Sequence, residues 1–224
     1  MILVTGTPRS GSSLMMQTLH LLGVPLVGDN DPDFNLRGAS YVHRKDLPQK
    51  YQDNILKRNP KGFFDIPLRS IGKYLANSPK GEAIKILDKI FGAHLDSKDI
   101  ECVIHCERRD RNAQIESCWD LMQADREYID EEIRGGYLKP DTIPYIALTS
   151  LRDASREDME QYYERQIPRL RDFALLQDKS LIMFYEDMLD YPRRSVTQIA
   201  GFLGLTSGLQ EAMENINTYE TTRL

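Results

Sequence analysis

The apolar residues of this chain fall into short runs separated by longer stretches of mixed character. Four runs stand out, at Ile2–Val4, Ala83–Leu87, Cys102–Cys106 and Leu181–Tyr185. Apolar runs of this length, bounded by polar or turn residues, predict buried strands. Because they alternate with stretches of helical periodicity, we expect parallel strands with helices on both faces. The pattern predicts an α/β fold, a three-layer domain whose mostly parallel sheet has four or five strands.

Helices are predicted where apolar residues recur at three- and four-residue spacing and where Gly or Pro marks an end. Pro168 lies inside the longest of these stretches, where we expect it to kink or split the helix. The expected helices are Gly11–Leu22 closed by Gly23, a helix around Pro67–Asn77, Arg111–Asp125, Arg156–Gln177, and a last main helix Arg193–Leu203 that Pro192 opens and Gly204 closes.

Two long segments show no clear period. Residues 28–62 are rich in Asp, Asn, Pro, Lys and Arg, and residues 126–155 contain two glycines and two prolines. Long polar segments in a compact domain are usually functional loops or lids. We expect short structured pieces within or beside them, an extended piece at 24–27 and short helices near 50–57 and 89–94.

Composition narrows the class of protein. The chain has 224 residues, 41% of them hydrophobic and 28% charged, which fits a single globular domain over residues 1–224. The net charge of −5 argues against nucleic acid as a partner. No run approaches the ~20 apolar residues of a membrane helix, and the chain enters its first strand without a charged leader. We therefore expect a soluble cytoplasmic protein whose oligomeric state the sequence leaves open.

The three cysteines do not suggest a metal site or a disulfide framework. Cys102, Cys106 and Cys118 form an odd set without a CxxC pair. We expect free, buried or half-buried thiols and no bound metal.

The turn after the first apolar run carries the strongest chemical signal. Gly6 and Gly11 are spaced as in the phosphate-binding loop GxxxxGK[ST], and two serines, Ser12 and Ser13, follow. Ser12 stands where that motif has its lysine, which reaches the terminal phosphates of a nucleoside triphosphate. A cation, Arg9, stands inside the loop instead. The loop therefore predicts an anion site made of backbone N–H groups and a helix N-terminus, for a ligand other than ATP or GTP.

Two further stretches carry candidate binding residues. Arg109 follows a predicted buried strand, and Ser117 lies two turns into the next helix, so the two side chains are candidates to clamp a second phosphate. A helix cap or surface ion pair is the plainer alternative for Arg109. Tyr185 ends a predicted strand on the edge where open α/β sheets bind ligands, although it is equally suited to the core.

These pieces, in this order, resemble the sulfotransferases that use 3′-phosphoadenosine 5′-phosphosulfate (PAPS). The loop Pro8–Ser13 reads PRSGSS, close to that family's PRSGTS, and an arginine is followed by a serine eight residues later. The sequence FYED at Phe184–Asp187 and the later FLG at Phe202–Gly204 also match, as does Asn59–Asp65, NPKGFFD, beside the NPKGYWE of bacterial members. The resemblance spans nearly the whole chain and implies a P-loop-like fold.

The resemblance also implies roles for the matching residues. The loop Pro8, Arg9, Ser10, Gly11, Ser12 and Ser13 would hold the 5′-phosphosulfate, with Arg9 stabilising charge on the leaving oxygen. Arg109 and Ser117 would bind the 3′-phosphate, and Tyr185 would lie near the adenine. The reaction would move a sulfonyl group to an acceptor hydroxyl or amine and release adenosine 3′,5′-bisphosphate (PAP). No metal is implied.

The acceptor's proton requires a base, and family members use a histidine or a glutamate. Asp65 stands at the glutamate of NPKGYWE, with a side chain one methylene shorter. His43, Asp29 and Asp31 in the polar segment are rivals. The acceptor itself is open among small molecules, carbohydrates and lipid headgroups.

Departures from the family leave two other functions open. The chain ends in TYETTRL rather than in a Gly-rich basic segment, and Lys85–Asp88 matches only part of a KDPR-like run. One alternative is a P-loop kinase or nucleotidase that uses ATP and magnesium. Ser12 and the lack of an evident acidic residue ending a strand near the loop argue against it. The other is a non-catalytic nucleotide-binding protein of the same fold.

Overall fold

The computed structural model describes residues 1–26, 80–87, 100–135 and 154–219, which form two compact units. The first unit runs up to Arg109 and resumes at Ile167, and the second is Asp110–Gln166. Several predictions fall outside the described residues: those for 28–62, for the helices at 67–77 and 89–94, for Asp88 at the end of the KDPR-like run, and for four candidate bases, Asp29, Asp31, His43 and Asp65.

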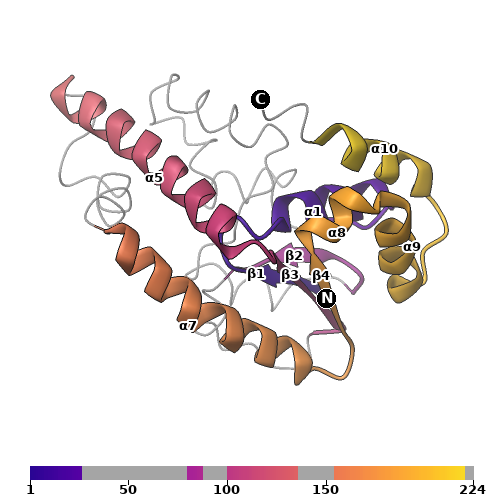
Figure 1. Ribbon diagram of the computed structural model, residues 1–224. Helices are drawn as coiled ribbons and strands as arrows, with labels where there is room; N and C mark the ends of the chain where they lie inside the picture. The colour runs from indigo at the N-terminus through magenta and orange to yellow at the C-terminus, as the bar shows by residue number, and fades with distance from the viewer. Residues whose placement is uncertain (27–79, 88–99, 136–153, 220–224) are drawn as a thin grey trace. The chain divides into compact units, whose positions relative to one another are not determined.

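The first unit is built on a parallel sheet of four described strands in the order β2-β1-β3-β4 (Figure 1). Their bounds are β1 Ile2–Gly6, β2 Ala83–Lys85, β3 Cys102–Glu107 and β4 Ser180–Phe184. All three pairings are parallel, so the α/β fold class is confirmed. Of the extended piece expected at 24–27, residues 24–26 are described, and Leu26 forms an isolated parallel bridge with Ala83.

Four helices of this unit gather on one face of the sheet (Figure 1). Two were predicted within a residue or so, α1 and α9, and Gly204 closes α9 in a left-handed conformation as expected. The expectation that the helix ending at Leu203 is the last main one is wrong, because α10 follows it. The bounds are α1 Ser12–Leu21, α8 Tyr185–Asp190, α9 Pro192–Leu203 and α10 Leu209–Tyr219.

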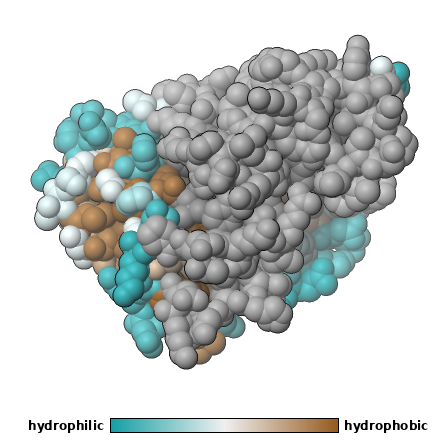
Figure 2. All heavy atoms as spheres, turned by 180° about the vertical axis from the view of Figure 1, so that it is seen from behind, coloured by the Kyte–Doolittle hydropathy of each residue, from teal (hydrophilic) through white to brown (hydrophobic). Residues whose placement is uncertain are grey.

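The core lies between this face of the sheet and the four helices. Alternate strand residues point into it, such as Ile2 and Val4 of β1 and Ile104 of β3, and they meet Leu14 and Leu19 of α1. Each of these five is at most 6% exposed. Partly buried apolar side chains extend the core along α9 and α10, and apolar atoms gather on that side of the molecule in Figure 2.

The opposite face of the sheet receives the second half of α7, Arg156–Leu175. Leu170 and Ala174 of this half are fully buried, and Arg171 bonds to Glu107 of β3. Pro168 lies inside the helix without splitting it. Its side chain is exposed, so water can satisfy the backbone carbonyl that loses its partner.

The second unit contains α5, Arg111–Arg134, and the first half of α7. Asp110 caps α5, since its Oδ1 accepts the Ala113 N–H at 2.8 Å. The helix continues nine residues beyond the predicted end at Asp125, so the irregular structure expected at 126–134 is wrong. Arg156 bonds to Glu116 of α5 and to Glu160 of α7.

The prediction of buried or half-buried thiols outside disulfides is confirmed, because Cys102 and Cys106 are buried, Cys118 is half-buried, and none of the three forms a disulfide. Within the described ranges no three His, Cys, Asp or Glu side chains are arranged to hold a metal ion. None of the described helices combines the length and apolar character needed to cross a membrane.

Candidate functional site

The loop between β1 and α1 is a tight turn centred on Arg9. The Ser10 N–H donates to the Thr7 carbonyl at 3.2 Å, with Pro8 and Arg9 at the two middle positions. Arg9 has a φ of 62°, which is left-handed and unfavourable for a residue with a side chain by about 1–2 kcal/mol. Such strain persists where the surrounding structure enforces it, often at functional sites. The Arg9 backbone is therefore held in a left-handed conformation in the loop, and its side chain is half-buried.

The two glycines of the motif are required by close packing. A Cβ on Gly6 would lie 2.5 Å from the Cys106 carbonyl oxygen and 2.5 Å from Ser10 Oγ. A Cβ on Gly11, whose φ is 90°, would lie 2.8 Å from Cδ2 of Tyr185. The first glycine thus lets the loop cross the end of β3, and the second lets it pack on an aromatic ring.

Three serines follow in the loop and in the first turn of α1. Ser10 and Ser12 are buried and Ser13 is half-buried. Ser10 Oγ forms no hydrogen bond to any described residue. The N-cap residue of α1 is Gly11, which has no side chain that could cap the helix. The first-turn N–H groups and the serine hydroxyls are thus suited to bind an anion.

A buried lysine from the neighbouring strand reaches the same turn. Lys85 ends β2, pairs with Val4 of β1 and is only 5% exposed. Its Nζ donates to Ser13 Oγ at 3.5 Å, the long end of hydrogen-bond range. Burying an ammonium group is costly unless a counter-charge or several acceptors meet it. The structure therefore places, beside the loop, a cation that the Ser12 position does not supply.

Two arginines after β3 are held by the FYED segment. The Arg109 guanidinium forms two bonds to the Asp187 carboxylate, at 2.5 and 2.6 Å, and it lies 4.1 Å from the centre of the Phe184 ring. The Arg109 N–H donates to Glu186 Oε2 at 3.0 Å. The pKa of Asp187 is lowered, chiefly by this bidentate bond, so the carboxylate stays ionised and competes for Arg109 with any incoming anion.

Arg108 contacts the same FYED segment, and its Nε lies 3.6 Å from Glu186 Oε1. Its guanidinium carbon lies 5.0 Å from the centre of the Tyr185 ring, within cation–π range. Tyr185 is the first residue of α8 rather than the last of β4, and it is 8% exposed. Its ring contacts Gly11, so it connects the loop to Arg108. Its role beside an adenine stays a prediction.

A buried carboxylate ends β3 on the other face of the sheet. Glu107 is 4% exposed, receives Arg171 Nε at 2.6 Å and a second Arg171 bond, and lies 3.0 Å from His105 Nε2. The sequence-based view that no acidic residue ends a strand near the loop is wrong, because β3 adjoins β1 directly. Glu107 is, however, already paired with a guanidinium.

This pairing makes a prediction about acid stability. Burial disfavours the charged form of Glu107, but the bonds from Arg171 and His105 outweigh it and lower the pKa from 4.5 to about 2. A carboxyl whose pKa is lower in the folded state stabilises the fold above its unfolded pKa and loses that contribution as the pH falls. We expect the free energy of unfolding to fall by up to about 3 kcal/mol between pH 5 and pH 2.

Urea unfolding of the wild type and of Glu107→Gln across that pH range measures the effect. The variant should be less stable at pH 7 and should show a flatter pH dependence. An unchanged slope in the variant would exclude Glu107 as the titrating group.

The structure brings together part of the predicted site. Pro8 to Ser13 form one loop, and Tyr185 contacts it. Ser117 lies on α5 in the second unit, whereas Arg109 belongs to the first. Asp65 and His43 lie outside the described residues.

Sequence reasoning missed three charged residues at or near the loop, Lys85, Arg108 and Asp187. Only strand pairing could place Lys85 beside β1. A second arginine next to Arg109 was a visible signal that was not used.

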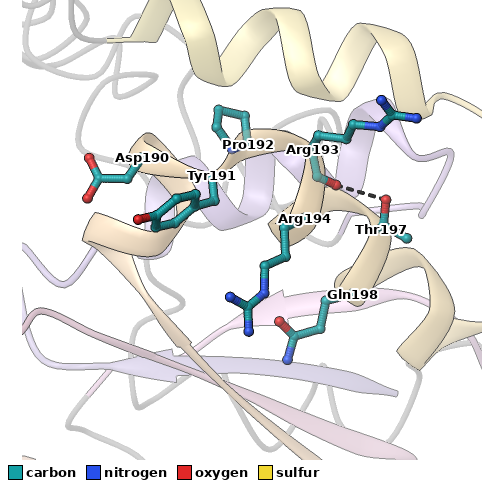
Figure 3. A pocket seen from close by; sticks show the side chains of 7 residues that line it. All are labelled: Asp190, Tyr191, Pro192, Arg193, Arg194, Thr197 and Gln198. Carbon is teal, nitrogen blue, oxygen red and sulfur yellow. Dashed lines mark hydrogen bonds between the residues drawn. The ribbon is translucent and has the colours of Figure 1, made fainter.

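A cavity of about 790 Å³ lies elsewhere, where α8 meets α9 (Figure 3). Tyr191, Arg193, Arg194 and Gln198 are among its lining residues, and no loop residue is. The Thr197 hydroxyl bonds to the Arg193 carbonyl at 2.8 Å, as the dashed line in Figure 3 shows. This cavity is thus separate from the loop.

Comparison with known proteins gives fold-level likeness alone. No protein-family model matches the chain, and no curated protein matches it in sequence. A structure of retinol dehydratase in complex with androsterone and the inactive cofactor PAP aligns with a TM-score of 0.47 and 16% identity, over 98% of this chain. A structure of the same enzyme with retinol and PAP gives 0.47, 15% and 98%. This chain spans 64 to 65% of the length of those chains.

Proposed function

We propose that this chain is a sulfotransferase that moves a sulfonyl group from PAPS to an acceptor hydroxyl or amine. The observation that carries the proposal is the pair of cations at the β1–α1 loop, Arg9 within it and Lys85 beside it. Arg9 is held in a strained conformation inside the loop, and buried Lys85 reaches Ser13 beside it. The choice of PAPS as donor comes from the resemblance of PRSGSS, Arg109 with Ser117, and FYED to the motifs of that family.

The proposed chemistry is an in-line displacement at sulfur. The acceptor oxygen or nitrogen forms a bond to sulfur while the bond from sulfur to the bridging oxygen breaks. Negative charge then develops on the oxygen that leaves with the 5′-phosphate. Preorganised donors aimed at developing charge supply a large share of catalysis. In this chain the donors would be the Arg9 guanidinium, the Lys85 ammonium and the N–H groups of the loop.

A kinase-type reaction with ATP and magnesium is the principal rival. The acidic residue at the end of β3, Glu107, is the one feature that favours it. Its two carboxylate oxygens already accept bonds from Arg171 and His105. A metal ion would have to displace the Arg171 guanidinium from a buried carboxylate whose charge it already balances, which costs more than binding at an open carboxylate.

Transfer of labelled sulfur tests the function. Purified protein is incubated with sulfur-35 PAPS and separate pools of sugars, phenols, small alcohols, amines and lipid headgroups. We expect one pool to gain label with equal release of adenosine bisphosphate. Intact donor binding without transfer to any pool or to water would favour a non-catalytic nucleotide-binding protein.

The competition for Arg109 makes a further prediction. If Arg109 holds the 3′-phosphate, Arg109→Ala should weaken adenosine bisphosphate binding by about tenfold to a hundredfold. Asp187→Asn removes the competing charge and should strengthen binding a few-fold, with the gain shrinking at high salt because both side chains are partly exposed.

Calorimetry of the two variants beside Arg108→Ala measures these changes. Unchanged affinity in both Arg109→Ala and Asp187→Asn would remove Arg109 from the site. A loss confined to Arg108→Ala would assign the phosphate to the arginine that contacts Tyr185.

A further inference from the structure

A row of buried polar side chains lies on the sheet face opposite α1. Thr5 of β1 pairs in register with His105 of β3, and Glu107 follows His105 by two residues. Side chains that pair in register, or that are two residues apart, point to the same face of a sheet. Thr5, His105 and Glu107 are 0%, 1% and 4% exposed. Three polar side chains are thus buried together at the carboxyl ends of the two central strands.

Arg171 and Glu107 fix the orientation of the imidazole. Glu107 receives two bonds from Arg171, and its Oε1 lies 3.0 Å from His105 Nε2. The pKa of Glu107 is lowered to about 2, so its carboxylate is ionised and acts as an acceptor. His105 Nε2 must therefore carry the hydrogen of that bond. In the neutral ring the lone pair then lies on Nδ1, the tautomer required of a base that a carboxylate orients.

Two polar atoms in this row lack partners. Neither His105 Nδ1 nor Thr5 Oγ1 forms a hydrogen bond to any residue in the described part of the chain. A buried polar atom without a partner costs about 1–3 kcal/mol. Most such atoms in folded proteins are paired, with protein or with ordered water, so these two atoms are suited to share one small hydroxyl-bearing partner.

This row adjoins the proposed donor loop. Thr5 is followed by Gly6, and the turn begins at Thr7, two residues or about 7 Å along the chain from Thr5. The pair Thr5 and His105 comes immediately before the pair Gly6 and Cys106 along the strands, and the loop crosses the end of β3 at that second pair.

We propose that His105 is the general base of the transfer and that Thr5 shares with it the binding of the acceptor hydroxyl. The proposal rests on the proposed function. As the acceptor oxygen bonds to sulfur and the bond to the bridging oxygen breaks, the hydroxyl proton moves to His105 Nδ1. The ring becomes an imidazolium beside the Glu107 carboxylate, and adenosine bisphosphate departs with the electron pair of the broken bond.

The charged groups around His105 suit this role. Glu107 from its own strand lies beside His105, Arg171 of α7 bonds to that Glu107, and the apolar Ile182 of β4 pairs with His105 in register. Glu107 stabilises a positive ring, and Arg171 keeps Glu107 ionised at low pH. Arg171 is thus a positioning residue rather than a catalytic one.

The test is His105→Gln, which places a donor near the former Nε2 and removes the basic nitrogen. His20→Gln, on the exposed surface of α1, is the matched control. The rate is measured with sulfur-35 PAPS as transfer to acceptor pools and as slow hydrolysis by water. We expect His105→Gln to lower both about 10²- to 10⁴-fold. The bisphosphate affinity of His105→Gln and the activity of His20→Gln should stay near wild type.

Thr5→Val is a second variant whose result does not depend on whether His105→Gln folds. It keeps the shape of the side chain and should lower the rate about tenfold, with Thr5→Ser restoring it. Wild-type rates in a folded His105→Gln, or in Thr5→Val, would overturn the proposal while leaving the donor proposal intact. Failure of the wild type to bind adenosine bisphosphate, or to consume PAPS by either route, would overturn both.

Discussion

We expect Arg9→Ala to lower the turnover of sulfonyl transfer by about 10²- to 10³-fold, the loss typical of removing one preorganised donor to a developing anion. Arg9 has a φ of 62°, so its place in the loop requires an unfavourable left-handed backbone conformation. That cost makes sense if the guanidinium must meet charge that appears only in the transition state. Adenosine bisphosphate affinity should change by less than about fivefold, since the bisphosphate retains its other contacts.

Arg9→Gly and Arg9→Lys are the controls for this prediction. Glycine adopts a left-handed conformation without strain, so Arg9→Gly should be at least as stable as Arg9→Ala and equally inactive. Lysine keeps a charge without the planar fork and should restore part of the rate. Single-turnover rates and calorimetric affinities separate the two effects. Equal losses of rate and affinity in Arg9→Ala would contradict a transition-state role.

The second large effect is expected at Lys85. Lys85→Met removes a buried ammonium beside Ser13 and keeps a side chain of similar size. We expect adenosine bisphosphate affinity to fall at least about thirtyfold, because the loop loses its buried cation. The free energy of unfolding should change by less than about 1.5 kcal/mol, because the substitution keeps the volume of the side chain.

Lys179→Met is the matched control, since Lys179 is exposed at the start of β4. Its affinity for the bisphosphate should equal that of the wild type. Thermal melting with and without bisphosphate measures stability and binding together. A Lys85→Met protein that is clearly destabilised but binds normally would make Lys85 a structural residue.

Local signals in the sequence predicted the elements that position the loop. The run Ile2–Val4, the spacing of Gly6 and Gly11 and the helix that follows were enough to place a strand, a turn and α1. Each of these depends on nearby residues. Gly6 and Gly11 also proved to be required by contacts with Cys106 and Tyr185 that the spacing alone did not reveal.

Contacts between strands that are far apart in the sequence could not be predicted from local patterns. Lys85 reaches Ser13 only because β2 pairs with β1. Glu107 lies near the loop only because β3 also pairs with β1. Strand order depends on how the whole sheet packs rather than on any local pattern. The sequence therefore indicated an anion site but not the cation beside it, nor the buried His105–Glu107 pair.

Helix ends were missed where apolar spacing was weak or overlooked. α5 continues to Arg134 through a stretch of mostly charged residues, which has no apolar stripe to mark it. α10 was more visible, because Ala212, Ile216 and Tyr219 recur at helical spacing and are buried. Gly208 just before it packs against the Leu21 backbone, where a side chain would not fit.

Calorimetric titration with adenosine 3′,5′-bisphosphate in the presence of EDTA tests the central claim most directly. Adenosine 5′-monophosphate and ATP with magnesium are titrated in parallel. The account predicts binding of the bisphosphate without metal, and at least about tenfold weaker binding of the monophosphate, which lacks the 3′-phosphate. It also predicts at least about thirtyfold weaker bisphosphate binding in Lys85→Met. Magnesium-dependent binding of ATP with no binding of the bisphosphate would contradict it.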